Sequence, residues 1–242
     1  MLVEQYVLEG VDKLSKMEQT FLVLLSELAN DLTTLGKLAA AAERHPSDPL
    51  EVKASAVLSL VLLRLLGARI WQSWELLRSF YNKQVLAQSS WLRSHSKLYA
   101  PIRKLKREFP EGCVWDRIRN QFAYHYDPGA LALVLANNVL GSQFEMVSSK
   151  ALTNSFFISS ELAIWYSILE VHDNHAFSEA YPALVKKAVH LGGDLVGVIG
   201  ELFKVFVDHV VNDLGGSWEA KSSTTSISEV HYENAVLPLF GV

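Results

Sequence analysis

Hydrophobic residues recur every three or four positions along most of the chain, which is the spacing of an amphipathic α-helix. The first such pattern predicts a helix over residues 3–44, which the sequence HPSDP then interrupts. A second long helix is expected from just after Pro49 to about residue 84, and its apolar positions cover most of its faces, as in the central helix of a bundle. The short connection between the two predicts an antiparallel pair.

The rest of the chain is also mostly helical in pattern. Pro101 is placed to begin a short helix that PEG at residues 110–112 stops, and a core helix that starts near Cys113 ends at Asp127-Pro128-Gly129, because the residue before a proline is disfavoured in helical geometry. Further helices are expected over residues 128–138, 160–172 and 178–214. FEMVSS and NSFFIS predict a small hairpin around residues 150–153.

These elements predict an all-α, antiparallel bundle of long helices with room for one small β-hairpin. The bundle is expected to occupy residues 1–214 as one domain. After Gly215-Gly216 the sequence becomes polar and ends in the apolar stretch AVLPLFGV. Residues 215–242 are therefore expected to form a C-terminal tail, either loose or docked.

The composition is that of a globular protein: of 242 residues, 50% are hydrophobic and 20% are charged. A single cysteine, Cys113, excludes an intrachain disulfide and a thiolate metal cluster. The N-terminus MLVEQYVLEG has no positively charged region of the kind that begins a signal peptide. The most apolar run contains Arg64 and Arg69 and is expected to be too short and too charged to cross a bilayer. We therefore expect a cytoplasmic protein that does not bind membranes.

The segment IRNQFAYHYDP, residues 118–128, places Arg119, Asn120 and His125 near the end of a predicted core helix. An arginine followed by a polar residue, four further residues and a histidine resembles the marker motif of the HEPN superfamily. In that superfamily the motif also lies near the end of a core helix in an all-α bundle. The flanking residues are similar to those of abortive-infection and toxin-like members. The resemblance covers the motif and its helical surroundings, about a third of the chain.

This resemblance implies a metal-independent endoribonuclease that acts as a homodimer, with RNA as its substrate, no cofactor, and a defence or toxin–antitoxin role in which an antitoxin protein is a further partner. The residue types suit that chemistry. Histidine can move the proton of the 2′-OH or protonate the leaving oxygen. The planar fork of Arg119 suits a phosphate, and Asn120 could hold the phosphate or orient the imidazole. The expected products are a 2′,3′-cyclic phosphate and a 5′-OH.

The spacing of Arg119 and His125 argues against an active site built from one chain. Six positions on an ideal α-helix separate Arg119 from His125 by about 120° around the axis and by roughly 9 Å along it. A long arginine side chain, an irregular last turn or a second chain could bring the two groups together, and the resemblance implies the second chain. The alternative is that Arg119 pairs with Asp116 one turn earlier, while His125 only caps the helix C-terminus.

Positive charge is concentrated just before the motif. The net charge of −4 gives no general reason to expect nucleic-acid binding, but residues 97–120 carry seven basic and three acidic residues. This stretch is either a solvated helical face or a track for a phosphate backbone. Tyrosines on both sides of His125 could stack on a base or pack at an interface. The predicted RNA-binding residues are Arg103, Lys104, Lys106, Arg107, Arg117, Tyr124 and Tyr126.

Other candidate residues have simpler interpretations. His172 and His175, in HDNH, are spaced to chelate a metal, but the sequence offers no third ligand, so solvated turn residues are expected. His209 is expected to be either exposed or at the edge of the core, without a chemical role. Four aromatic residues at helical spacing are expected to pack in the core: Trp71, Trp74, Phe80 and Tyr81.

Two alternatives to the ribonuclease remain from the sequence. The first is a HEPN-like module without catalysis that binds a nucleotide or a protein partner. The second is a helical interaction protein in which the motif is accidental. RNA cleavage in the presence of EDTA would separate the ribonuclease from both.

Overall fold

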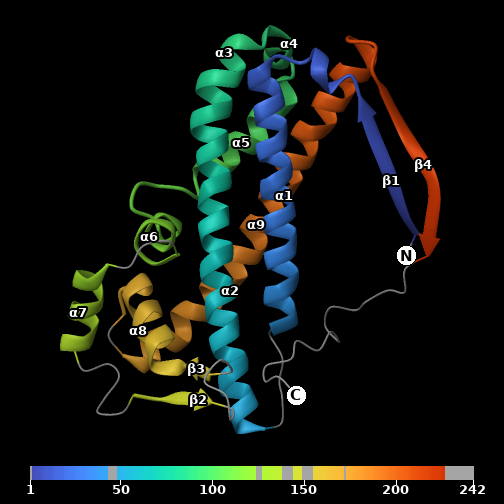
Figure 1. Ribbon diagram of the computed structural model, residues 1–242. Helices are drawn as coiled ribbons and strands as arrows, with labels where there is room; N and C mark the ends of the chain where they lie inside the picture. The colour runs from blue at the N-terminus through green and yellow to red at the C-terminus, as the bar shows by residue number, and fades with distance from the viewer. Residues whose placement is uncertain are drawn as a thin grey trace. The chain divides into compact units, whose positions relative to one another are not determined.

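The computed structural model describes residues 2–42, 48–123, 127–137, 144–148, 155–171 and 173–226. Three long helices are α1 (Lys16–Ala42), α2 (Pro49–Glu75) and α9 (Asn174–Asn212). The shorter α-helices are α3 (Leu86–Gln88), α4 (Ser90–Arg93), α5 (Tyr99–Lys106), α6 (Val114–Arg117), α7 (Pro128–Ala136) and α8 (Ile158–Leu169). These elements confirm the all-α prediction (Figure 1).

Two segments are π-helical: η2 (Leu76–Val85), which joins α2 to α3, and η4 (Ile118–Ala123), which continues α6. Two short 3-10 helices are η1 (Val11–Lys13) and η3 (Ser96–Leu98). The predicted hairpin is present as β2 (Met146–Ser148) paired antiparallel with β3 (Ser155–Phe157). Its expected turn, residues 150–153, lies outside the described residues.

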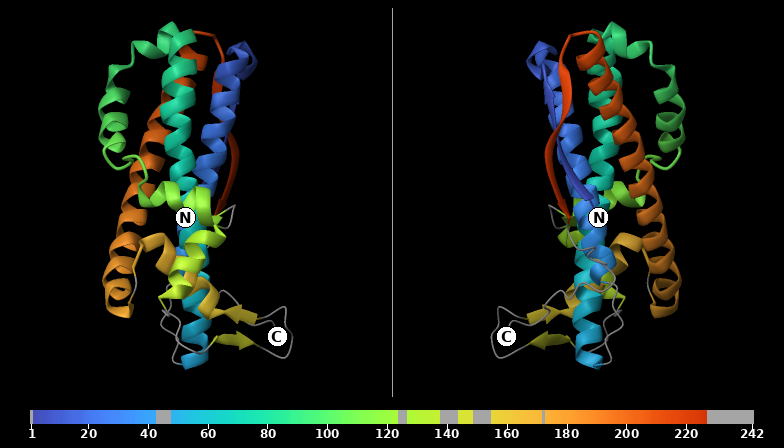
Figure 2. Two further views of the ribbon diagram at one scale, coloured as in Figure 1. Left: turned by 90° about the vertical axis from the view of Figure 1, so that its left-hand side faces the viewer. Right: turned by 90° about the vertical axis from the view of Figure 1, so that its right-hand side faces the viewer.

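The predicted helix over residues 3–44 is wrong at its N-terminal end. Residues Leu2–Glu9 form strand β1, which pairs antiparallel with β4 (Ser217–Ser226), and α1 begins only at Lys16. Figures 1 and 2 show the two strands side by side. Part of the expected tail is therefore a strand. Gly216 permits the pairing, because a Cβ there would lie 2.3 Å from the backbone oxygen of Glu9.

The chain divides into two compact units, and each is described by itself. Unit 1 contains the described residues of 1–31, 72–110 and 193–226, and unit 2 contains those of 32–71 and 111–192. The long helices α1, α2 and α9 each contribute residues to both units. The expected boundary between residues 214 and 215 stays a prediction.

Aromatic rings from three helices form the core of unit 1. Phe21 of α1 stacks on Phe80 and Tyr81 of η2, with ring centroids 5.9 and 5.4 Å away, and it meets Phe206 of α9 at 5.9 Å. Trp74 stacks on Phe109 at 5.0 Å, which ties the segment after α5 to the end of α2. Of the four aromatic residues predicted to pack in the core, Trp74 and Tyr81 are buried, whereas Trp71 and Phe80 are half-buried.

Helix α2 is the centre of unit 2. The indole of Trp165 in α8 donates to the backbone oxygen of Leu60 at 3.1 Å, and Arg64 donates to Glu161 of α8 at 3.1 Å. On α6 and η4, Trp115 and Ile118 lie against Gly67, where an added Cβ would meet both side chains within 3.4 Å. The contacts of α2 with α8 and α6 agree with the prediction that its apolar positions cover most faces.

The continuous helix Pro49–Gln88 has 40 residues and is long and apolar enough, by length and composition, to cross a membrane. The apolar run that contains Arg64 and Arg69 was expected to be too short to cross a bilayer, and the length of this helix shows that expectation to be wrong. Most of its apolar window is buried within the protein, and the core helix of a soluble protein meets the same criterion. The cytoplasmic location stays a prediction.

Candidate functional site

The candidate motif begins on a helix with one buried and one exposed face. Trp115, Ile118 and Phe122 are almost completely buried and attach α6 and η4 to unit 2. Arg119 is partly exposed and Asn120 is exposed, so both lie on the outer side of the helix. The apolar spacing of the first three residues therefore determines which side of the helix the arginine and the amide occupy.

Arg119, Asn120 and Asp116 form a series of hydrogen bonds on this outer side. The guanidinium of Arg119 donates to the side-chain oxygen of Asn120, and the amide nitrogen of Asn120 donates to the carboxylate of Asp116. The amide must be oriented this way, because the guanidinium only donates and an ionised carboxylate only accepts. The sequence offered a direct ion pair between Arg119 and Asp116 as an alternative. In the structure Asn120 lies between them and makes one hydrogen bond to each.

Most N–H donors of Arg119 have no acceptor among the described residues. A guanidinium has five N–H donors, and its one hydrogen bond within the described residues goes to Asn120. Asn120, held by Asp116, restricts the rotation of the guanidinium without neutralising it. The arrangement can present a preoriented cation to a phosphate.

The motif lies in a π-helical segment, η4. Its hydrogen bonds run from residue i to i+5, so the ideal α-helical rotation used above for Arg119 and His125 does not hold over Ile118–Ala123. Single π-turns are often found at functional sites. Tyr124, His125 and Tyr126 lie outside the described residues, and their roles stay predictions. Asp127 accepts from the backbone N–H of Gly129 and Ala130 and caps α7, as expected for a helix that begins at Pro128.

Arg117, predicted to bind RNA, makes several contacts within unit 2. Its Nε donates to the backbone oxygen of Ile168 at 3.2 Å, its Nη1 donates to that of Gly112 at 3.2 Å, and it pairs with Glu170 at 3.3 Å. Glu170 ends α8 in the left-handed region, with φ of 55°. Arg117 therefore ties α6 to the end of α8, and its predicted RNA-binding role stays a prediction.

The four basic residues in and just after α5 are all exposed; we call them the α5 basic face: Arg103, Lys104, Lys106 and Arg107. The opposite side of α5 is buried through Ile102 and Leu105. Lys104 pairs with Asp194 of α9 at 2.9 Å. The other three residues of the face make no ion pair with the part of the chain that the structure describes.

A buried carboxylate in unit 1 was not found from the sequence. Glu18 is 7% exposed and accepts from the backbone N–H of Ser15 at 2.8 Å, from the indole of Trp91 at 2.7 Å and from the hydroxyl of Ser89. Burial raises the pKa of Glu18, but the hydrogen bonds from Ser89, Ser15 and Trp91 outweigh it and leave that pKa below its usual value. The detectable signal was Ser15-x-x-Glu18, a capping box at the start of α1.

His209 belongs to the same part of unit 1. Its ring stacks on Trp91 with centroids 3.7 Å apart, and its Nδ1 lies 2.6 Å from the carboxylate of Asp213. The side chain of His209 is 11% exposed, which agrees with the expected position at the core edge. Trp91 therefore links the Glu18 carboxylate to α9.

Metal ligands do not gather in the described residues: no group of three or more His, Cys, Asp or Glu side chains is placed to hold an ion there. His175 is exposed and lies 3.8 Å from Glu179 on the next turn. His172 lies outside the described residues. His175 is solvated as predicted, but it lies in the first turn of α9 (Asn174–Asn212) and not in the expected turn between helices.

Protein-family models, curated proteins and solved structures were each compared with the chain, and none of them matches it.

Proposed function

We propose that this protein is a metal-independent endoribonuclease of HEPN type that works as a homodimer in a defence or toxin–antitoxin setting. The observation that carries the proposal is the hydrogen-bonded series from Arg119 through Asn120 to Asp116 on the exposed side of η4. A structural arginine would be expected to use its guanidinium in several internal bonds, as Arg117 does. Arg119 has one such bond among the described residues, which leaves most of its donors for an acceptor such as a phosphate.

In the proposed reaction the 2′-oxygen attacks the adjacent phosphorus, and the bond from phosphorus to the 5′-oxygen breaks. One imidazole removes the 2′-OH proton, and a second, protonated imidazole gives a proton to the departing 5′-oxygen. Each chain supplies one His125, so the homodimer supplies both. Arg119 stabilises the charge that develops on the phosphorane, because its planar fork can bind two oxygens at once.

Asn120 and Asp116 have positioning roles in this proposal. Asn120 accepts from the guanidinium and holds it in a fixed orientation, while Asp116 holds the amide. A fixed cation loses less conformational freedom when it binds the phosphorane, which lowers the barrier. Replacing Asp116 by Asn should therefore lower kcat more than it raises KM.

The test is cleavage of a mixed RNA by the full chain in EDTA, with analysis of the product ends. Arg119→Ala and His125→Ala should abolish cleavage, while Arg119→Lys, which keeps the charge but loses the fork, should leave a small fraction. Arg78→Ala is the matched control, since Arg78 is an exposed arginine that pairs with Glu75 on its own helix. Full activity in Arg119→Ala, or a strict need for a divalent metal, would refute the proposal.

The competing function is a HEPN-like module that binds RNA, nucleotides or a protein without cutting. It predicts RNA binding by the wild type with no turnover at any concentration. It also predicts that Arg119→Ala weakens binding, whereas the ribonuclease proposal places the larger loss in the chemical step.

A further inference from the structure

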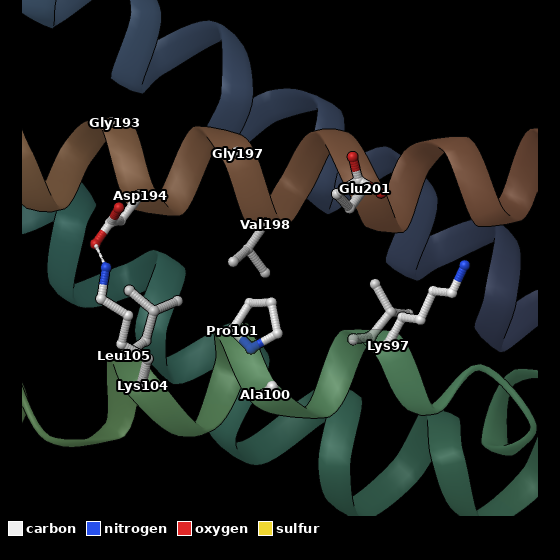
Figure 3. A pocket seen from close by; sticks show the side chains of 11 residues that line it. Lys97, Ala100, Pro101, Lys104, Leu105, Gly193, Asp194, Gly197, Val198 and Glu201 are labelled. Atoms are coloured by element: carbon white, nitrogen blue, oxygen red, sulfur yellow. Dashed lines mark hydrogen bonds and ion pairs between the residues drawn. The ribbon is translucent and has the colours of Figure 1, made fainter.

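Unit 1 contains a cavity between η3–α5 on one side and α9 on the other. Its volume is about 630 Å³, and Figure 3 shows its lining. Small residues face each other across it: Ala100 and Pro101 from α5, Gly193 and Gly197 from α9. The helices leave this space open because none of these side chains is long enough to fill it. The volume is within the range of small-ligand sites.

The charged groups differ between the two ends of the cavity. At one end the Lys104–Asp194 ion pair, 2.9 Å long, joins the two walls. At the other end Lys97 and Glu201 stand on opposite walls, as Figure 3 shows. Neither makes an ion pair with the part of the chain that the structure describes. An occupant with an apolar body, an anionic group for Lys97 and N–H donors for Glu201 would complement this end.

We propose that this cavity holds one unpaired base of the RNA, and that the base is guanine. In this proposal the flat base lies in the cavity against the ring of Pro101, on the wall that faces α9 (Figure 3). Guanine presents two adjacent N–H donors on one edge, which a carboxylate such as Glu201 can accept together. Its phosphate would then meet Lys97.

The surroundings favour a base within a strand over a free apolar ligand. The α5 basic face lies on and just after the helix that carries Pro101, and three of its cations have no ion pair among the described residues and are available to neighbouring phosphates. Proteins that bind single-stranded RNA combine a basic surface with slots for splayed bases in this way. The inference takes its ligand, RNA, from the proposed function, but it is independent of the Arg119 chemistry.

Two glycines of α9 provide a matched pair of substitutions. Gly197 lines the cavity and Gly200 does not, yet both are exposed, and an added Cβ at either has no heavy atom within 4 Å. Gly197→Leu should fill the cavity, whereas Gly200→Leu adds the same side chain outside it. Both should fold, because leucine is a better helix former than glycine. Glu201→Gln then tests the carboxylate itself.

The experiment measures binding of fluorescent 2′-O-methyl RNAs, which cannot be cut, to the full chain. Each is about nine nucleotides of uridine with one central G, A, C or U. The wild type should bind the G strand about tenfold more tightly than the U strand. Glu201→Gln and Gly197→Leu should bind all four strands alike, and Gly200→Leu should keep the preference.

Three results would overturn the proposal. The first is equal binding of all four strands by the wild type. The second is an equal effect of Gly197→Leu and Gly200→Leu on base preference. The third is a change in oligomeric state in Gly197→Leu without loss of base preference, which would assign the cavity to packing against a second copy of the chain. Because no strand is cut, failure of the ribonuclease proposal would leave this measurement unaffected.

Discussion

Gly67 on α2 lets the helix that carries the candidate motif approach closely, and this contact gives a quantitative prediction. An added Cβ at Gly67 would lie 2.9 Å from Cδ1 and 3.2 Å from Cγ2 of Ile118, and 3.4 Å from Cε3 of Trp115. Both neighbouring side chains are 0% exposed, so neither can move into solvent. Gly67→Ala must therefore displace packed atoms beside Arg119.

Two opposing free-energy terms determine the result. Alanine in place of glycine in a helix interior stabilises by about 1 kcal/mol. Overpacking a well-packed core costs about 1–3 kcal/mol. Gly67→Ala should therefore lower the free energy of unfolding by roughly 0–2 kcal/mol. Gly36→Ala in α1 is the control within the same unit, since no heavy atom lies within 4 Å of its added Cβ. That variant should gain about 1 kcal/mol.

A second substitution identifies the atom responsible. Ile118→Val removes Cδ1, the nearest atom, and alone should cost about 0.5–1.5 kcal/mol. Combined with Gly67→Ala it should cost less than the sum of the two, because the added methyl occupies the vacated space. Urea unfolding followed by far-UV circular dichroism gives the change in the free energy of unfolding for each of the three single variants and for the double variant. Equal stabilisation by Gly67→Ala and Gly36→Ala, or strict additivity at positions 67 and 118, would refute the reasoning.

Four further outcomes are expected. Glu18→Gln should lower the free energy of unfolding by about 1–3 kcal/mol at neutral pH. Since the folded pKa of Glu18 lies below its unfolded value, its stabilisation is present above the unfolded pKa and is lost as the pH falls through the folded pKa. The difference between wild type and variant in urea titrations should therefore shrink below about pH 4, and a constant difference would contradict this. Glu161→Ala should lower the free energy of unfolding by about 3–5 kcal/mol, because it leaves the buried Arg64 without its partner. The double variant Arg64→Met, Glu161→Leu should leave the free energy of unfolding nearly unchanged in the same urea titrations. Replacing all four residues of the α5 basic face by glutamine should reduce the slope of log binding constant against log salt concentration by about 2, because three of these cations have no ion pair among the described residues. An unchanged slope would mean that the α5 basic face is a solvated face. Sedimentation should report a dimer whose RNase activity falls on dilution, and mixing Arg119→Ala with His125→Ala chains should restore part of the activity; a fully active monomer would exclude the shared site.

The candidate site was partly predictable from the sequence. Arg119 and Asn120 were identified from their spacing to His125, and their exposure follows from the apolar positions that alternate with them. The bond from Asn120 to Asp116 was not foreseen, because a helix turn offers Asp116 to Arg119 and to Asn120 alike. The π-helical geometry of η4 was not foreseen either, since π-turns have no strong pattern of residue types.

The long helices were determined by the sequence itself, because the period of hydrophobic positions is a property of neighbouring residues. Helix α2 begins at Pro49 and α7 begins at Pro128, as the prolines predict, but the prediction that Pro101 begins its helix is wrong by two residues, because α5 begins at Tyr99. The N-terminal segment shows the opposite case. LVEQYVLE also fits a helical pattern, and only its pairing with residues 217–226, at the other end of the chain, makes it a strand.

What the tertiary structure decided was every feature that depends on residues far apart in the chain. The pKa of the buried Glu18 lies below its usual value partly because Ser89 and Trp91, just before and within α4, donate hydrogen bonds to its carboxylate. The cavity beside Pro101 exists only because α9 presents glycines opposite α5. The order of residues along the chain predicts the helices and the residue types on their faces. Which faces meet depends on side-chain volumes and hydrogen-bond partners that come together only when the chain folds.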